Sequence, residues 1–282
     1  MNDLVFVDST FDKDKSIEYK LSIRVSSDGF SFSILNANKH CVALERFKAF
    51  NQNTEADTLN SFKELIRNNE LLNLEYNSVA VLWVSNKAVI IPNDFFSEKF
   101  AFESYQLCHN LSSDTELHWN DLDQLNSKNV FAVPLSFKEI LIKQFSTIKF
   151  FHHSTPFYKT AIKDEISDNH PSVYVNLQKE YFHIIIPDRN GKHFINSFAY
   201  KEDADLTYHI LNVYKQHKLN NERSKLIVDG LVQEESKSIQ LLKKYLANVE
   251  VKLLPAKLRI KNEIPHKEYN QFINLLNLTE CE

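Results

Sequence analysis

Hydrophobic and polar residues alternate most clearly between residues 171 and 200, where the pattern predicts three consecutive β-strands. β-Branched and aromatic residues fill 173–176, 181–187 and 193–200, and this composition is typical of strands. Asn190 and Gly191 predict a tight turn between the second and third strands, because both residues tolerate positive φ angles. The stretch is therefore interpreted as a three-stranded meander.

The same pattern occurs near the start of the chain. Residues 19–25, 30–35 and 40–50 predict three further strands, with a turn at Asp28 and Gly29. At an offset of roughly 152 residues, the apolar face of the second strand in one copy aligns with that in the other. The aligned residues are Phe30, Phe32 and Ile34 with Phe182, Ile184 and Ile186.

Helices and strands are predicted to alternate after each meander. The predicted helices span 53–72, 94–110 (a helix or a mixed segment), 135–145, 157–166, 203–217, 234–246 and 266–278. The predicted strands span 78–84, 87–92, 130–133, 147–152, 225–228 and 249–254. Residues 1–16 predict a partly ordered lead-in, and the polar residues 117–128 predict a loop or short strand. Each half therefore has the order β-β-β-α-β-α-β.

This order, occurring twice, is characteristic of the actin, Hsp70 and sugar-kinase superfamily. The whole chain resembles a Bacteroidetes family of uncharacterised proteins, domain of unknown function 3822. Its local sequence is also similar to degenerate actin-like proteins of pilus assembly and secretion, in VIIPNDFF at 89–96, LIVDG at 226–230 and QEESKSIQLLKKYL at 233–246. The resemblance implies an α/β fold with two duplicated actin-like, ribonuclease H-like halves, each with a mixed sheet, and a cleft between them. The expected halves are residues 1–153, with an insertion around 90–128, and residues 154–282.

The resemblance also indicates where phosphate would bind. In active members, an Asp-x-Gly turn between strands one and two of each half contacts phosphate and the metal ion. The matching positions here are Arg24-Val25-Ser26 and Asn176-Leu177-Gln178, so both aspartates and both glycines are replaced. Arginine can pair with a phosphate but cannot hold Mg²⁺.

The third superfamily motif normally ends a strand in Gly-Gly, and only Gly230 of that pair remains. Asp229, Gly230 and Ser236 could still let a ligand approach, whereas the alternative is a plain strand-to-helix turn. The degenerate cofactor-binding positions are Arg24, Ser26, Ser27, Asn176, Gln178, Lys179, Asp229, Gly230 and Ser236. ATP hydrolysis by the usual superfamily chemistry is therefore not expected, and neither is a bound cofactor.

Composition narrows the possible functions further. The chain has only three glycines in 282 residues, and phosphate cradles built from backbone N–H groups usually need glycine. A net charge of −4 does not indicate a broad basic surface that would bind nucleic acid. No apolar run is long enough to span a bilayer, and no signal peptide is visible, so a cytoplasmic location is expected. The three separated cysteines predict neither a disulfide framework nor a metal site.

Two functions remain open. The first is a non-catalytic protein-binding or scaffold module, a pseudoenzyme with an unknown protein partner. The second is an ATP-binding protein, phosphotransferase or ATPase with Mg²⁺, whose carboxylates come from elsewhere, such as Asp28, Glu180 or Asp229. An aromatic cluster in the insertion, Phe95, Phe96, Phe100, Phe102 and Tyr105, is interpreted either as core or as an exposed patch for a partner.

Overall fold

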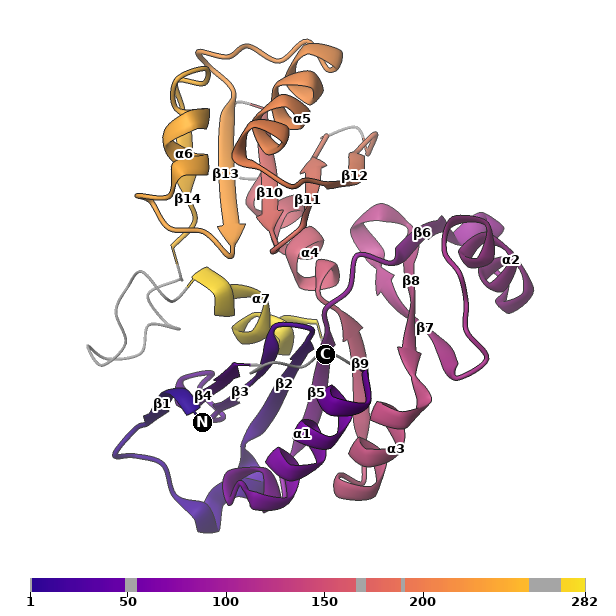
Figure 1. The fold of residues 1–282 in the computed structure, drawn as a ribbon, viewed down its shortest axis with the longest axis vertical. Helices are drawn as coiled ribbons and strands as arrows, with labels where there is room; N and C mark the ends of the chain where they lie inside the picture. The colour runs from indigo at the N-terminus through magenta and orange to yellow at the C-terminus, as the bar shows by residue number, and fades with distance from the viewer. Residues whose placement is uncertain (1, 49–54, 166–170, 189–190, 254–269, 282) are drawn as a thin grey trace. The chain divides into compact units, whose positions relative to one another are not determined.

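A computed structural model describes residues 2–48, 55–165, 171–188, 191–253 and 270–281. The chain divides into two compact units. The first contains the described residues up to Thr155 together with 275–281, and the second contains those from Pro156 to 253 together with 270–274. The two units are described separately below, and Figure 1 shows the elements of each.

The first unit is built on a six-stranded mixed sheet. Its strands, in the order β1-β4-β3-β2-β5-β9, are β1 (Asn2–Val7), β4 (Cys41–Lys48), β3 (Gly29–Leu35), β2 (Lys20–Ser26), β5 (Ser78–Trp83) and β9 (Ile148–His152). Strands β2, β5 and β9 run parallel. Helices α1 (Glu55–Asn68) and α3 (Leu135–Gln144) bury Phe62 and Phe137 in the same apolar core as the sheet.

The prediction of a partly ordered lead-in for residues 1–16 was wrong. Residues Asn2–Val7 form β1, which pairs antiparallel with β4, and Lys13–Glu18 form a 3-10 helix. The strand is short and lies at the edge of the sheet with Val5 and Val7 exposed, so the chain has no strong apolar alternation there. The last two residues of the strand predicted at 40–50 lie outside the described residues.

The insertion forms a small sheet of its own within the first unit. Strands β6 (Ala88–Pro92), β8 (Ser127–Pro134) and β7 (Thr115–Leu122) lie in the order β6-β8-β7, and α2 (Glu98–Cys108) packs against β6 and β8. Residues 117–128 are thus one strand, a 3-10 turn and the start of another strand. Sequence reasoning undercounted them because a polar residue, Asn120, fills a buried position. Its side chain donates to the Phe150 carbonyl and accepts from the His152 N–H.

The second unit contains a five-stranded mixed sheet in the order β12-β11-β10-β13-β14. Its strands are β10 (Ser172–Leu177), β11 (Tyr181–Ile186), β12 (Phe194–Ala199), β13 (Lys225–Gly230) and β14 (Val249–Val251). Helices α5 (Asp203–Gln216) and α6 (Lys237–Leu242) pack on it through an apolar core that includes Leu206 and Ile239. Helix α4 (Ser154–Glu165) leads into this unit, and α7 (Ile273–Leu276) lies near the end of the chain.

Five strands of the first sheet, β4-β3-β2-β5-β9, correspond in order and register to the five strands of the second, and β1 is an additional edge strand. This correspondence confirms the predicted α/β fold class. Val25 pairs with Phe30 in the first sheet and Leu177 pairs with Phe182 in the second, so the offset of 152 residues holds on both strands. In each unit the first strand of the meander also pairs in parallel with the strand that follows the next helix. The structure is therefore an α/β fold with two mixed sheets, as in duplicated actin-like halves, and a small antiparallel sheet in the insertion. Within the described ranges, every helix is too short or too polar to cross a lipid bilayer.

Candidate functional site

The first predicted phosphate-turn position lies near the end of β2, where Arg24 and Asp28 form an ion pair. The Arg24 guanidinium donates to both Asp28 carboxylate oxygens, at 3.1 and 3.5 Å. Ser26 is buried and Ser27 is exposed. Burial tends to raise the pKa of Asp28, but the Arg24 charge and a hydrogen bond from Ser26 outweigh it and lower the pKa. The carboxylate is therefore held ionised beside Arg24, and it offsets the only cation of this turn.

The matching turn of the second unit is filled by three buried polar side chains. Gln178 Nε2 donates to Asn176 Oδ1 at 2.8 Å, and Asn176 Nδ2 donates to Asp229 Oδ1 at 2.5 Å. We call these three residues the amide–carboxylate cluster. β10 and β13 run parallel and place Asn176 directly opposite Asp229. Each side chain is at most 8% exposed, so the cluster is an internal network rather than an open polar surface.

Asp229 is the one carboxylate of this cluster, and its pKa is strongly shifted. Burial raises its pKa from 3.8 to about 6, while the positive charge of Lys252 and the hydrogen bond from Asn176 act in the opposite direction. Lys252 itself binds the Asp164 carboxylate, with Nζ 2.5 Å from Oδ2. Sequence reasoning missed both Lys252 and Asp164, since neither belongs to a motif and they are 88 residues apart.

Gly230 has a structural reason to be glycine. Its φ angle is +92°, and a Cβ at this position would lie 2.2 Å from the Leu177 carbonyl oxygen and 3.1 Å from Asn176 Nδ2. The Gly230 backbone lies this close to Leu177 because the two residues are paired between β10 and β13. The Leu231 N–H donates to the same Leu177 carbonyl. The glycine thus serves the packing of two strands.

The remaining predicted positions lie apart from the cluster. Ser236 donates through Oγ to the Gln233 carbonyl at 2.7 Å, within its own turn before α6. Lys179 is exposed after β10. The structure therefore brings Asn176, Gln178, Asp229 and Gly230 together, and it does not bring Ser236 or Lys179 into their hydrogen-bond network.

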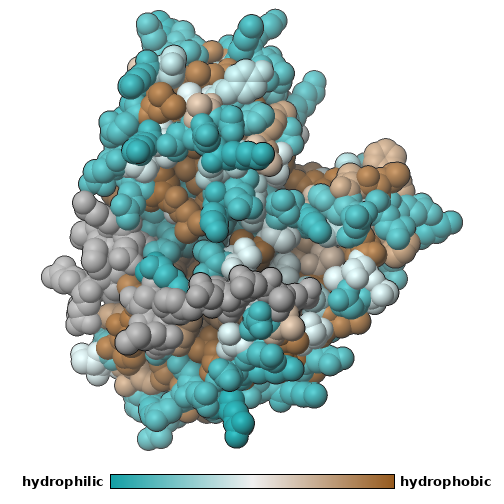
Figure 2. Space-filling model, in the orientation of Figure 1, coloured by the Kyte–Doolittle hydropathy of each residue, from teal (hydrophilic) through white to brown (hydrophobic). Residues whose placement is uncertain are grey.

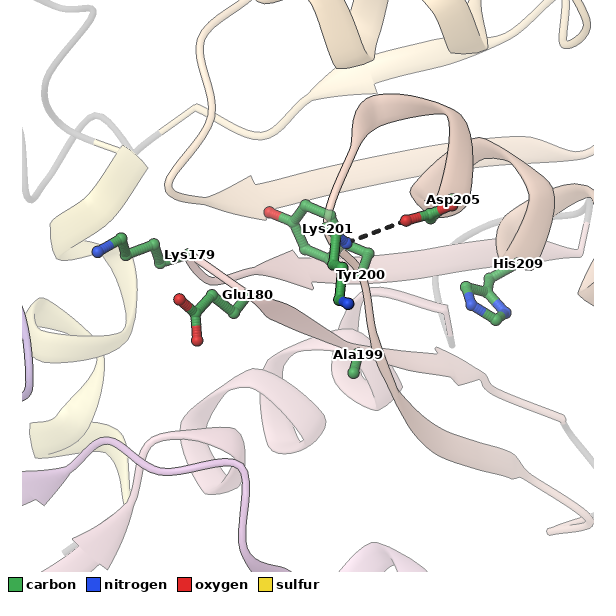
Figure 3. A pocket seen from close by; sticks show the side chains of 7 residues that line it. All are labelled: Lys179, Glu180, Ala199, Tyr200, Lys201, Asp205 and His209. Atoms are coloured by element: carbon green, nitrogen blue, oxygen red, sulfur yellow. Dashed lines mark hydrogen bonds between the residues drawn. The ribbon is translucent and has the colours of Figure 1, made fainter.

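Lys179 instead lines a groove at the end of β12 (Figure 3). The groove has a volume of about 610 Å³ and is also lined by Glu180, Ala199, Tyr200, Lys201, Asp205 and His209. The Tyr200 hydroxyl donates to the Gln178 carbonyl at 2.6 Å, which links the groove wall to the turn of the cluster. The Asp205 carboxylate accepts from the backbone N–H groups of Lys201 and Glu202. It thereby caps the start of α5 in a capping box.

The side chains at these turns do not fit Mg²⁺ and a nucleotide triphosphate. A hard cation needs carboxylate oxygens that are free to ligate it, whereas Asp28 is paired with Arg24 and Asp229 accepts from Asn176. The Gln178 N–H, which a phosphate would use, donates to the Tyr181 carbonyl. Among the three carboxylates named as examples for a relocated site, Asp28 and Asp229 are held by these contacts, whereas Glu180 is exposed.

These features define a class of protein: an actin-like fold in which the turns expected to bind phosphate hold internal polar contacts. The chain belongs to the family described as protein of unknown function, DUF3822, whose model matches residues 8–249. The resemblance to this family is thereby confirmed.

Two solved structures show the same fold. A protein of Bacteroides thetaiotaomicron "with actin-like ATPase fold and unknown function" superposes with a TM-score of 0.81 at 24% identity, covering 97% of this chain and all of that one. The PilM–PilN type IV pilus biogenesis complex superposes with a TM-score of 0.62 at 13% identity, covering 95% of this chain and 99% of that one. Among curated proteins, no relative matches the chain.

Proposed function

We propose that this protein is a non-catalytic protein-binding or scaffold module built on the actin-like fold. The observation that carries the proposal is a concentration of exposed apolar side chains on the insertion, at Phe95, Phe100, Phe102, Leu107 and Trp119. We call the part of the protein surface that carries them the insertion surface. These five residues are 38–88% exposed, and they are five of the fourteen large hydrophobic residues exposed in the described part of the chain. A concentration of exposed apolar residues on one substructure is typical of protein interaction sites.

The local fold explains why these side chains are not buried. Ala101 and Tyr105 form the face of α2 that packs on the small sheet. Phe100 and Leu107 are seven residues apart and lie on the opposite face of the helix. Figure 2 shows brown and tan atoms on the part of the first unit that carries α2. The aromatic cluster expected from the sequence therefore divides into a buried part, at Tyr105, and an exposed part.

The replaced phosphate turns support the non-catalytic half of the proposal. Glutamine occupies the position where a glycine would admit phosphate, and its side chain is buried against Asn176. The structurally similar PilM–PilN structure is described as a type IV pilus biogenesis complex. A fold of this type can thus be used to hold a protein partner, which is consistent with the proposal.

A nucleotide titration tests the non-catalytic part. A ligand present at 100 times its Kd stabilises a protein by about 2.7 kcal/mol, which raises the melting temperature by several degrees. We expect no such shift with millimolar ATP or ADP, with or without Mg²⁺, and no release of phosphate. A shift that is present in the wild type and lost in both Arg24→Ala and Asp229→Ala would overturn the proposal and favour the ATP-binding alternative.

A binding comparison tests the other part. We expect a Phe100→Ser/Leu107→Ser double variant to lose partners that the wild-type protein captures from its native extract. The matched control is Ile142→Ser, which removes an exposed apolar side chain on α3, outside this surface. Equal capture by all three proteins would show that the insertion surface does not bind the partner.

A further inference from the structure

The edge of the second sheet offers a different surface, in the other unit. Strand β12 pairs with β11 on one side and with no described strand on the other. Its sequence, FINSFA, contains no charged residue and no proline. Edge strands are usually protected by lysine, proline, a bulge or a covering element, because their unpaired backbone groups can pair with another chain. This edge lacks the sequence-encoded protections.

Hydrogen bonds show which backbone groups of β12 point outward. The Tyr200 N–H donates to the Glu180 carbonyl, towards β11, whereas the Ser197 N–H donates to the Asn196 side chain. Inward and outward groups alternate along an antiparallel strand. The backbone groups of Ile195, Ser197 and Ala199 therefore face away from β11, at a strand where Asn196, Ser197 and Ala199 are exposed.

The edge leads directly into the groove of Figure 3. Ala199 ends the strand, and the next two residues, Tyr200 and Lys201, form part of the groove wall. The lining combines the Tyr200 and His209 rings with two lysines and two carboxylates, so its formal charges balance and it suits an uncharged polar side chain better than either an anion or a cation. A strand laid along β12 would place a side chain beside this recess.

We propose that β12 binds an extended, uncharged segment of a partner protein, which adds to the sheet as a sixth strand and places one side chain in the groove. Strand addition of this kind takes its affinity from main-chain hydrogen bonds and its specificity from side-chain pockets. A hetero partner fits better than a second copy of this chain. In a two-fold pairing centred on Ser197, each of the two copies would have to break its hydrogen bond from the Ser197 N–H to the Asn196 side chain. A hetero partner requires only one such bond to break.

The test uses a short acetylated and amidated peptide of alternating threonine and valine at millimolar concentration. We expect amide exchange to slow at Ile195, Ser197 and Ala199 but not at Asn196 and Phe198. Two N-methylated forms of the peptide, blocked at alternate residues, should differ, because only one set of peptide N–H groups can face β12. Equal binding by both forms would overturn the proposal.

Ser197→Pro removes the central outward N–H without removing a backbone hydrogen bond to β11, although it also loses the hydroxyl bond to His183 Nδ1, and proline is tolerated at such edge positions. The matched control is Ser197→Ala, which loses the hydroxyl bond to His183 Nδ1 but keeps the N–H. We expect peptide binding to weaken roughly tenfold in the proline variant only. A dimer that forms without peptide and is abolished by Ser197→Pro would instead assign this edge to a second copy, and unchanged binding in both variants would refute the proposal.

Discussion

Replacement of Asp229 by asparagine should stabilise the second unit at neutral pH. In the folded protein, burial raises the pKa of this carboxyl to about 6, against 3.8 for an exposed one. Between these two values the folded state binds more protons than the unfolded state, so stability falls as pH rises through the folded pKa. Stability conferred by the protonated carboxyl is complete below pH 4 and is lost above pH 6.

The size of the effect follows from the shift. The difference of 2.2 between the two pKa values corresponds to about 3 kcal/mol at pH 8, since one pKa unit is worth about 1.4 kcal/mol. Asparagine keeps an oxygen that can accept from Asn176 and removes the buried charge. Its added NH₂ group needs an acceptor of its own, so we expect a gain of about 1–3 kcal/mol at pH 8 and almost none at pH 4.

The measurement must report on the second unit alone. Both tryptophans, Trp83 and Trp119, lie in the first unit, so their fluorescence does not follow the unfolding of the second. Amide hydrogen exchange in β10 and β13 follows the unfolding of the second unit, and it is to be measured at pH 5, 6.5 and 8. Glu222→Gln, which neutralises an exposed carboxylate in the same unit, is the matched control. If Asp229→Asn slowed exchange equally at all three pH values, or accelerated it at pH 8, the argument from the buried charge would be refuted.

Three other changes follow from the described contacts. Gly230→Ala should destabilise the second unit by about 2–4 kcal/mol, because its Cβ would lie 2.2 Å from a backbone oxygen, and exchange of β13 amides should accelerate. Asp28→Asn should lower the stability of the first unit by about 1 kcal/mol, measured by urea unfolding, and more salt should reduce the difference. Burial lowers the pKa of His152 to about 3, partly opposed by its hydrogen bond to the Ser85 carbonyl. The first unit should therefore lose about 2 kcal/mol between pH 7 and pH 5, as followed by tryptophan fluorescence, and His152→Gln should reduce that loss.

The strands of both meanders were predictable because their apolar residues are close in sequence and alternate. Phe30, Phe32 and Ile34 point into one core, and their counterparts at 182–186 point into the other. The same reasoning missed β1 and most of β7, where edge position and buried polar residues weaken the alternation. It also made α6 too long, since Lys237–Leu242 alone is helical within the predicted 234–246.

The positions of the candidate site were predictable, but their partners were not. Superfamily order locates Asn176 and Asp229 along the chain, whereas their contact depends on the pairing of β10 with β13, which are separated by 53 residues. Gly230 was open to two interpretations from sequence, a ligand approach or a turn. The geometry adds a third reason, the closeness of Leu177, which no local pattern encodes.

Asn176 and Asp229 are in contact, so the effect of replacing one on stability should depend on which residue is present at the other. Asn176→Asp, which introduces the aspartate expected from the superfamily resemblance, tests this dependence. Asn176→Asp would put two buried carboxylates where one oxygen and one nitrogen are now 2.5 Å apart. Two carboxylates this close cannot both be ionised. We expect the second unit to lose about 3 kcal/mol at pH 8 and to recover most of it near pH 5, where the pair can share a proton. Amide exchange of β10 would report both effects.

The reversed pair, Asn176→Asp with Asp229→Asn, is the decisive control. It restores one carboxylate and one amide, and Gln178 can still donate to the residue at 176, so the double variant should be about as stable as the wild type at both pH values. If Asn176 were only a solvated turn residue, the single variant would be harmless and the second substitution would rescue nothing. Rescue by the reversed pair would mean that an aspartate at 176 is incompatible with the carboxylate at 229, so that the two paired strands constrain each other's side chains at these positions.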